Sequence, residues 1–357
     1  MYEVDVLAVV GTCAPERARH AARLAAASGR VLFHAQRLRM AVDPVQEAID
    51  LVPWTDRVAG AVCEFPTATL PVELIGSLVD ESARIRLSGI VCVVDAAHLL
   101  VDLRRDHYLT RSAIGDEGPT TEYVAHAMLT VAQLEYASMI VLVNWEPLPT
   151  PELSAVLALA SHLSPHARLR LERDGAIEIP ERAEPYGIGQ ERPGWVAILN
   201  GDHAPHMTDP RVSAFRYEQL RPFHPMRLQR VLDDRIEPGE FGTVVRSAGM
   251  CRLATRPRVI AEWEHVGRML SIEPLALDAP DEGADDGSGE DAREREHEVL
   301  ALGQDLAFIG LDLDAAALTE ALDAAALTDD ELRAGPAEWR RYPDPFPAWL
   351  GVSERAE

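Results

Sequence analysis

The chain has 357 residues, 47% of them hydrophobic, and a formal net charge of −24. A surface this acidic repels phosphate backbones, which disfavours direct nucleic-acid binding through a basic face. No stretch of about 18 apolar residues is free of charge, so no membrane span is expected. The four cysteines are widely separated and form no CxxC pair, which favours a cytoplasmic protein with reduced thiols.

Short apolar runs alternate with helical stretches through the first half of the chain. The expected strands are Val4–Val10, Arg30–Phe33, Val58–Phe65, Gly89–Val94, Met139–Val143 and Arg168–Leu171. The expected helices are Pro15–Ala27, Pro71–Glu81, Glu122–Tyr136 and Leu153–His162. This alternation predicts an α/β fold, a mostly parallel sheet with helices on both faces, over residues 1–177.

The composition changes after residue 177. Residues 178–211 are rich in proline, glycine and charge and are expected to form a linker. Residues 212–350 are predicted to form a small α+β domain. Its expected strands are Ser213–Leu220, Thr243–Ala254 and Leu300–Leu313, and its expected helices are Pro225–Asp233 and Ala315–Ala326. Within it, residues 278–298 are strongly acidic and poor in apolar side chains, which predicts a disordered insert.

The second half also carries the most specific motifs. The segment from Phe215 to Pro225 reads FRYEQLRPFHP and contains Arg221, Pro222, Phe223 and His224. It resembles the signature that opens the CobW C-terminal domain. Further resemblances follow in the same order as in that family: VRSAG from Val245 and DPFP from Asp344. We expect His224 to hold the turn between a strand and a helix.

The resemblance to the CobW-like family implies a P-loop NTPase-like fold of the CobW/HypB/UreG class, followed by the CobW C-terminal domain. Proteins of this class hydrolyse GTP with Mg²⁺ and are associated with metal delivery, zinc homeostasis and cobalamin synthesis. They typically carry a Cys-x-Cys-Cys metal motif. No cysteine lies between Arg30 and Val58, and the HxxH pair His203 and His206 has no third soft ligand nearby, so no ligand motif supports a zinc site.

The phosphate loop departs from the family pattern. The chain contains no lysine, so the 34 basic residues are all arginine. The corresponding segment, Gly11–Ala18, reads GTCAPERA. Gly11 is retained and Arg17 occupies the lysine position, whereas Ala14 and Glu16 replace glycines and Ala18 has no hydroxyl for magnesium. Pro15 removes an N–H that could bind phosphate. These changes predict a loop that keeps its shape and has lost its ligand.

Other positions retain single residues of the nucleotide site. Glu64 belongs to a switch-like segment, Asp95 ends a strand as in the family's Val-Asp-Ala sequence, and Asn144 is what remains of the guanine-reading Asn-Lys-x-Asp. With Gly11, Thr12 and Arg17 they form the predicted vestigial nucleotide site, which contains no catalytic residue.

Three functions remain open from the sequence. The first is a pseudo-GTPase adaptor in zinc homeostasis, with a ribosome-associated or metal-client protein as partner. The branch of the family that recruits a ribosome hibernation factor under zinc limitation has similar losses. The second is an active GTPase metallochaperone that binds GTP and Mg²⁺, with Arg17 replacing the lysine and Thr12 helping to hold the metal. The third is an oligomer in which a partner completes the site and residues 278–298 serve as a docking arm.

Overall fold

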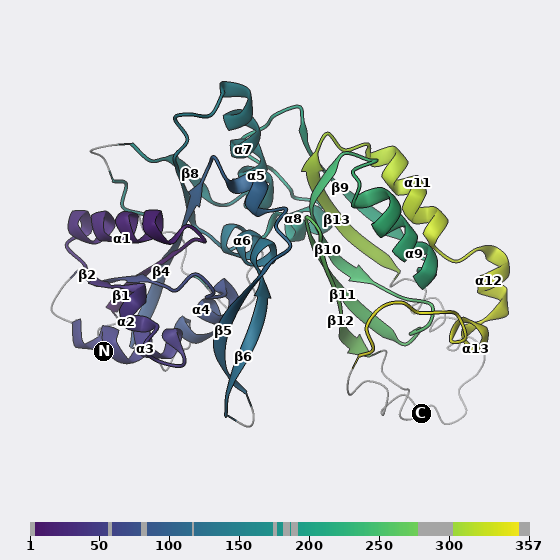
Figure 1. The fold of residues 1–357 in the computed structure, drawn as a ribbon, viewed down its shortest axis with the longest axis horizontal. Coiled ribbons are helices and arrows are strands. Elements are labelled where there is room, and N and C mark those ends of the chain that lie inside the picture. Colours follow the sequence, from purple (N-terminus) through teal and green to yellow (C-terminus); the bar gives the residue numbers. More distant parts are fainter. Residues whose placement is uncertain are drawn as a thin grey trace. The chain divides into compact units, whose positions relative to one another are not determined.

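A computed structural model describes residues 4–55, 59–79, 84–115, 118–173, 177–180, 186, 192–277 and 303–349. The chain divides into two compact units (Figure 1): Met1–Ala197 with His203–Asp209, and Ile198–Asp202 with Pro210–Glu357. The acidic insert predicted at 278–298 lies outside the described residues. No helix in the described ranges has the length and apolar content needed to cross a bilayer.

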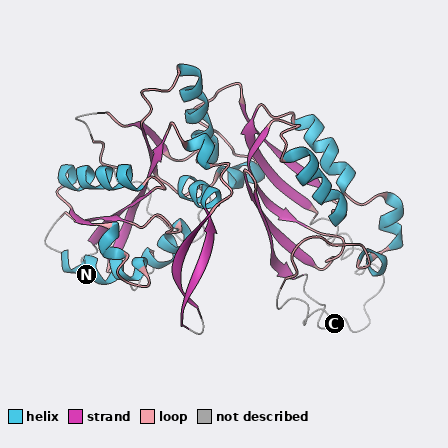
Figure 2. Ribbon diagram, viewed as in Figure 1, coloured by secondary structure: helices cyan, strands magenta, loops and turns pink. Residues whose placement is uncertain are grey.

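A six-stranded parallel sheet organises the first unit (Figure 2). Its strands, in spatial order, are β2 (Val31–Phe33), β3 (Ala61–Glu64), β1 (Val4–Val10), β4 (Ile85–Asp95), β7 (Met139–Val143) and β8 (Arg168–Leu171). Every residue of β3 and β7 is buried, as expected for strands covered on both faces. The chain leaves β3, β1, β4 and β7 at the same edge, because all four strands run in the same direction.

Helices connect these strands. They are α1 (Ala14–Ser28), α2 (Ala35–Leu38), α3 (Pro44–Leu51), α4 (Pro71–Leu78), α5 (Leu99–Asp102), α6 (His126–Glu135), α7 (Thr150–Leu163) and α8 (Gly194–Asn200), with a 3₁₀ turn at Val52–Thr55. Helix α1 packs Ala21, Leu24 and Ala25 against β1, β3 and β4 in one apolar cluster. It ends at Gly29, whose φ of +67° suits glycine.

One predicted helix is partly wrong. The segment Glu122–Tyr136 was expected to be helical throughout, but residues up to Ala125 belong to a hairpin of β5 (Tyr108–Gly115) and β6 (Gly118–Ala125). Helix α6 begins only at His126. Threonine, tyrosine and valine dominate β6, and these residue types favour a pleated strand over a helix. The helical spacing of apolar residues that predicted this helix therefore comes from the residues of α6 only.

The second unit contains a five-stranded antiparallel sheet. Its strands, in spatial order, are β12 (Met269–Leu277), β11 (Val259–Val266), β10 (Thr243–Cys251), β13 (Gln304–Leu311) and β9 (Val212–Gln219). Its helices are α9 (Pro225–Val231), α11 (Ala315–Ala325), α12 (Asp329–Ala334) and α13 (Pro336–Trp339), and a π-helical turn, Leu232–Ile236, follows α9. Phe223, Trp263 and Phe308 are fully buried in the core of this unit.

The predicted fold class is confirmed: a mostly parallel α/β sheet with its helices precedes a separate α+β domain. The sequence missed β11 and β12, although both strands alternate buried and exposed positions in part. The predicted linker at 178–211 stays a prediction. Helix α8 lies within that segment and crosses the boundary between the two units.

Candidate functional site

The predicted site residues of the first unit gather at the carboxyl edge of the parallel sheet. Glu64 ends β3 and Asp95 ends β4, while Gly11 and Asn144 directly follow β1 and β7. Open parallel sheets bind their ligands at this edge, where the loops between strands and helices meet. The topology therefore brings together residues from four separate parts of the sequence.

The turn after β1 is pressed against β4. Gly11 has a φ of +144°, and a Cβ atom there would lie 2.3 Å from the carbonyl oxygen of Val93. The Cys13 thiol donates a hydrogen bond to the same carbonyl at 3.3 Å, and burial raises the pKa of Cys13 to about 11. The turn thus requires glycine for close approach to β4, whether or not a ligand is bound.

Arg17 points into the protein from the first turn of α1. Its Nη1 atom donates to the Gly11 carbonyl at 2.5 Å and to Thr67 Oγ1 at 3.0 Å, and its Nε atom lies 3.3 Å from Glu64 Oε1. The residue is 2% exposed. Burial lowers the pKa of Arg17, and the neighbouring Glu64 carboxylate opposes that shift. The guanidinium therefore acts as the counter-ion of Glu64 within the loop.

The second oxygen of Glu64 is also occupied. Glu64 Oε2 accepts the backbone N–H of Ala35 at 3.2 Å and lies 3.5 Å from His34 Nδ1. Neither His34 nor Thr67 was assigned a role from the sequence. The available signal was the hydroxyl of Thr67, three residues after Glu64 in the switch-like segment, because a hydroxyl can accept a hydrogen bond from a guanidinium.

The residues present do not fit GTP and Mg²⁺ in the manner that the resemblance implies. The cation at the lysine position is hydrogen-bonded to a carbonyl, a hydroxyl and a carboxylate of the chain itself. Pro15 offers no N–H at the start of α1, and Ala18 offers no hydroxyl. Thr12 is partly exposed beside this turn.

Asp95 and Asn144 contact each other at the same edge. Asn144 adopts a φ of +53° and donates from Nδ2 to Asp95 Oδ2 at 2.8 Å. Partial burial raises the pKa of Asp95, but the hydrogen bonds from Asn144 and His98 outweigh it, so that the net pKa is lowered. In turn, the hydrogen bond to Asp95 raises the pKa of His98. The backbone N–H of Ala97 also donates to Asp95, so this carboxylate stabilises the turn after β4.

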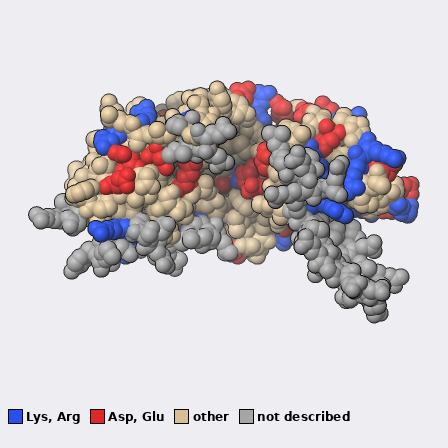
Figure 3. Space-filling model, turned by 90° about the horizontal axis from the view of Figure 1, so that it is seen from below, with Lys and Arg blue, Asp and Glu red and all other residues tan. Residues whose placement is uncertain are grey.

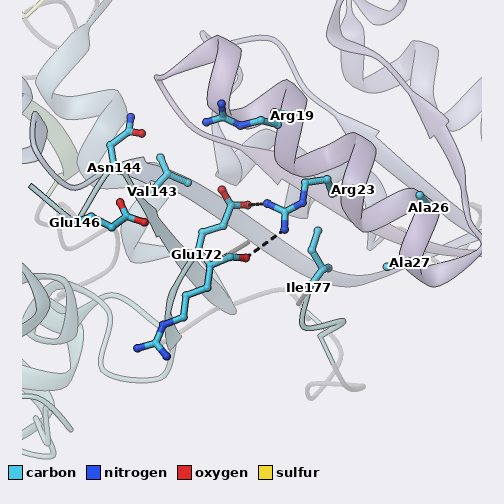
Figure 4. Close-up of a pocket in the computed structure, with 10 residues that line it drawn as sticks. Arg19, Arg23, Ala26, Ala27, Val143, Asn144, Glu146, Glu172 and Ile177 are labelled. Carbon is cyan, nitrogen blue, oxygen red and sulfur yellow. Dashed lines mark hydrogen bonds and ion pairs between the residues drawn. The ribbon is translucent and has the colours of Figure 1, made fainter. Parts of the chain in front are cut away.

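A cleft of about 660 Å³ lies beside Asn144 (Figure 4). Arg19 and Arg23 line it from α1, and Glu172 lines it from the segment after β8. Arg23 pairs with the Glu172 carboxylate at 3.0 Å, and His20 Nδ1 lies 2.8 Å from the same oxygen. The cleft is therefore polar, and the Glu172 carboxylate on its wall is already paired with basic side chains.

Trp145 occupies the position of the family's guanine-reading lysine and is held in place by the chain. Its indole N–H donates to the Glu172 carbonyl at 2.8 Å, and the Arg173 guanidinium lies 5.8 Å from the ring centroid. This anchoring fixes the tryptophan against β8 as a packing residue.

The histidine pair His203 and His206 contacts α7. Nε2 of His203 donates to the His162 carbonyl at 3.1 Å, and Nδ1 of His206 lies 3.1 Å from Ser161 Oγ. In the part of the chain that the structure describes, no three His, Cys, Asp or Glu side chains are arranged to hold a metal ion. These contacts bind the segment after α8 to α7.

The signature of the second unit joins three segments. Phe223 donates its N–H to Arg252 and accepts from Ala254, both at 2.9 Å. Pro222 accepts from the N–H of Leu327 at 2.9 Å, and Arg221 pairs with Asp329 at 2.6 Å.

His224 precedes α9 in this signature. Its N–H donates to the Ala325 carbonyl at 2.8 Å, and its ring stacks on Tyr342 at 4.7 Å. Its contacts therefore connect the start of α9 with the end of α11 and with the segment after α13.

Comparisons with known proteins support this organisation. Residues 212–326 match the cobalamin synthesis protein cobW C-terminal domain. The chain is 27% identical over 293 residues to zinc-regulated GTPase metalloprotein activator 1 of Dictyostelium discoideum, a match that covers 78% of this chain and 60% of that protein. It is also 27% identical over 286 residues to a zinc chaperone of Mycobacterium tuberculosis, covering 74% of this chain and 62% of that one.

The matches therefore span about three fifths of the length of these relatives. Among solved structures, the Zn(II)-bound YjiA GTPase from E. coli is similar at 13% identity with a TM-score of 0.37, covering 92% of this chain and 100% of that one. Together, the domain match and the relatives show that this chain is similar to CobW-like proteins, with residues 212–326 matching the CobW C-terminal domain.

Proposed function

We propose that this chain is a pseudo-GTPase adaptor of metal homeostasis, which binds a client protein without hydrolysing GTP. The observation that carries the proposal is the closed pair of Arg17 and Glu64 at the phosphate-loop position. Its relatives are named as a zinc-regulated GTPase metalloprotein activator and a zinc chaperone, which favours a role in handling zinc or its clients.

The energetics of the buried pair of Arg17 and Glu64 disfavour nucleotide binding. If Arg17 turned toward a phosphate group, Glu64 would remain 4% exposed without its cation. Leaving one partner of a buried ion pair alone costs about 3–5 kcal/mol. An incoming nucleotide would have to supply that free energy and bring its own negative charge next to the Glu64 carboxylate.

Calorimetric titration of the whole chain with GTP and GDP, each with Mg²⁺, tests the proposal. We expect no saturable heat, and no change in the Arg17→Ala variant. The positive control combines four substitutions that restore the family pattern: Ala14→Gly, Glu16→Gly, Arg17→Lys and Ala18→Thr. Micromolar GTP binding by the unmodified chain, lost in Arg17→Ala, would overturn the proposal.

That result would instead favour the second candidate, an active GTPase metallochaperone with an arginine-based loop. The observation in its favour is that the Gly11 turn, Asp95 and Asn144 still share one sheet edge beside a cleft of about 660 Å³. A GTP turnover assay with and without Zn²⁺ then separates hydrolysis from binding.

For the client, we propose a ribosome hibernation factor recruited when zinc is scarce, because the lost motifs resemble those lost in that branch of the family. The expected result is co-sedimentation of the chain with ribosomes from zinc-starved cells and its absence from ribosomes of zinc-replete cells. A chain that sediments with neither ribosomes nor the factor under zinc starvation would exclude this client and leave the metal-client alternative.

A further inference from the structure

A second groove of the first unit, of about 610 Å³, lies on the side of the β5–β6 hairpin. Its walls come from the α2–α3 connection, the segment after β3, helix α4 and strand β5, and Ala14 and Arg17 line it as well. Figure 1 shows the hairpin extending from the parallel sheet, with β5 on the side of α4. The apolar lining includes Val42, Pro66, Ala68 and Leu109.

Strand β5 presents an open edge to this groove. Among the described strands it pairs only with β6, in a two-stranded sheet. His126 donates its N–H to the His107 carbonyl at 3.0 Å, which makes this pair a hydrogen-bonded one. Because such pairs alternate in an antiparallel ladder, the N–H and C=O groups of Thr110 and Ser112 point away from β6. Both residues line the groove, and within the described ranges these backbone groups have no hydrogen-bond partner.

The other edge of the hairpin is less suited to pairing. Pro119 of β6 stands opposite Ile114 in one of the open pairs, and proline has no N–H to donate. Unpaired edge groups are a ready template for another strand, and natural proteins usually cover or interrupt them. The edge of the hairpin that faces the groove, that of β5, is therefore the one that can accept another strand.

One arginine of the groove has no carboxylate partner in the described part of the chain, although the lining as a whole carries three arginines and three carboxylates. Arg111 is paired with Glu73 and with Glu122, each at 2.6 Å, and Asp43 accepts two backbone N–H groups at the start of α3. By contrast, Arg39 is exposed, and no carboxylate of the described residues lies within ion-pair distance of it. Elsewhere, on the face shown in Figure 3, acidic side chains form clusters between the arginines. This single unpaired cation can pair with one carboxylate of a partner.

We propose that this groove binds an extended segment of a partner protein as a strand added to β5, with a carboxylate of that segment pairing with Arg39. Main-chain bonds to Thr110 and Ser112 supply affinity, and alternate side chains of the segment contact Val42, Pro66 and Leu109. The inference deepens the proposed adaptor function by naming its client-binding surface, and none of the contacts that it invokes is made by Ala14 or Arg17 of the nucleotide loop.

The test uses a fluorescein-labelled peptide of alternating valine and threonine that ends in two glutamates, titrated into the whole chain. Thr110→Pro removes an N–H from the groove edge without breaking the β5–β6 ladder, and we expect it to weaken binding about tenfold or more. Thr121→Pro is the matched control, because Thr121 stands opposite Ser112 and directs its N–H to the other edge. It should leave the affinity unchanged.

Hydrogen exchange gives the structural readout. Bound peptide should slow exchange of the Thr110 and Ser112 amides and leave the Thr121 amide unaffected.

The ion pair is tested separately. Arg39→Gln should weaken peptide binding about threefold to fivefold, and so should replacing the two glutamates of the peptide by glutamines. Combining the two changes should weaken binding no further, because each removes the same ion pair. Equal losses in the two proline variants, or binding without amide protection, would overturn the proposal. So would competition by inorganic phosphate or occupation of the edge by a second copy of the chain.

These outcomes are separable from those of the proposed function. If GTP binds and the peptide also binds as described, the pseudo-GTPase proposal fails and the strand-addition site stands. If neither GTP nor the peptide binds, the adaptor proposal survives and this surface is excluded.

Discussion

The turn between β1 and α1 and the turn between β9 and α9 begin their helices in a similar way but are stabilised by different interactions. Each places a proline in the first turn of its helix, and neither helix has a side-chain cap. The first turn is held by the buried pair of Arg17 and Glu64. The second is held by backbone hydrogen bonds of Phe223 and His224 and by partly exposed ion pairs such as Arg227 with Glu331.

This difference concerns how each turn is stabilised. The first turn places N–H groups and the Arg17 cation near a helix N-terminus, an arrangement that attracts an anion. Glu64 supplies that anion from the neighbouring strand. The turn before α9 has ion pairs at the surface and no buried cation of its own, and main-chain hydrogen bonds and ring stacking support it. We therefore expect the first turn to be the more sensitive to single substitutions.

The largest effect is expected from Gly11→Ala. The new Cβ would meet the Val93 carbonyl at 2.3 Å in a backbone conformation of φ +144°. Strain and overpacking together should cost about 4 kcal/mol of unfolding free energy. Gly29→Ala is the control, because Gly29 also has positive φ but meets nothing within 4 Å, and it should cost about 1 kcal/mol. Urea unfolding followed by circular dichroism measures both, and equal losses would contradict the close packing of the loop on β4.

The next effect tests the buried pair itself. Arg17→Met should lower the unfolding free energy by about 3 kcal/mol, because it leaves the Glu64 carboxylate buried without a cation. Glu64→Gln in the same background should recover much of that loss, since a neutral amide costs less to bury. The double-mutant cycle in urea gives the coupling energy. Strictly additive losses would show that the two side chains do not stabilise each other.

In the second unit, His265 should make stability depend on pH. Burial lowers the pKa of His265 to about 4, and Arg246 adds to this shift. The folded-state pKa is thus below the unfolded value of about 6.5, so the stabilisation is complete above that pH and is lost as pH falls toward about 4. We expect a loss of about 3 kcal/mol over this range. His265→Gln should flatten the corresponding part of the stability curve, and an unchanged curve would exclude a neutral buried His265.

The smallest effect is expected at the exposed side of the second turn. The hydrogen bonds from Arg227 lower the pKa of Glu331 to about 2. A depressed carboxyl pKa contributes stability above the unfolded value, and this is lost as pH falls from about 4.5 through about 2. Because the pair is partly solvated, Arg227→Gln should cost only about 1 kcal/mol at neutral pH. The difference between the two proteins should vanish near pH 2, and a difference that persists there would point to packing of the Arg227 side chain instead.

Much of the framework could be predicted from local sequence. The apolar runs that form β1, β4 and β7 identified the parallel sheet, because strands buried on both faces are almost continuously hydrophobic. The hairpin β5–β6 was missed, since its strands alternate polar and apolar residues weakly and adjoin a true helix. Its open edge depends on the pairing register, which no local pattern specifies.

The sequence by itself determined the α/β class, the order of the parallel-sheet strands along the chain, the signature around Phe223 and the absence of a lysine from the loop. Only the tertiary structure decided where Arg17 points and what it binds. The reason is physical: Glu64 and Thr67 lie about 50 residues from Arg17 in the chain, and only the parallel alignment of β1 with β3 brings them to the same edge. Charge compensation in a buried site is set by neighbours in space, which a linear motif does not contain.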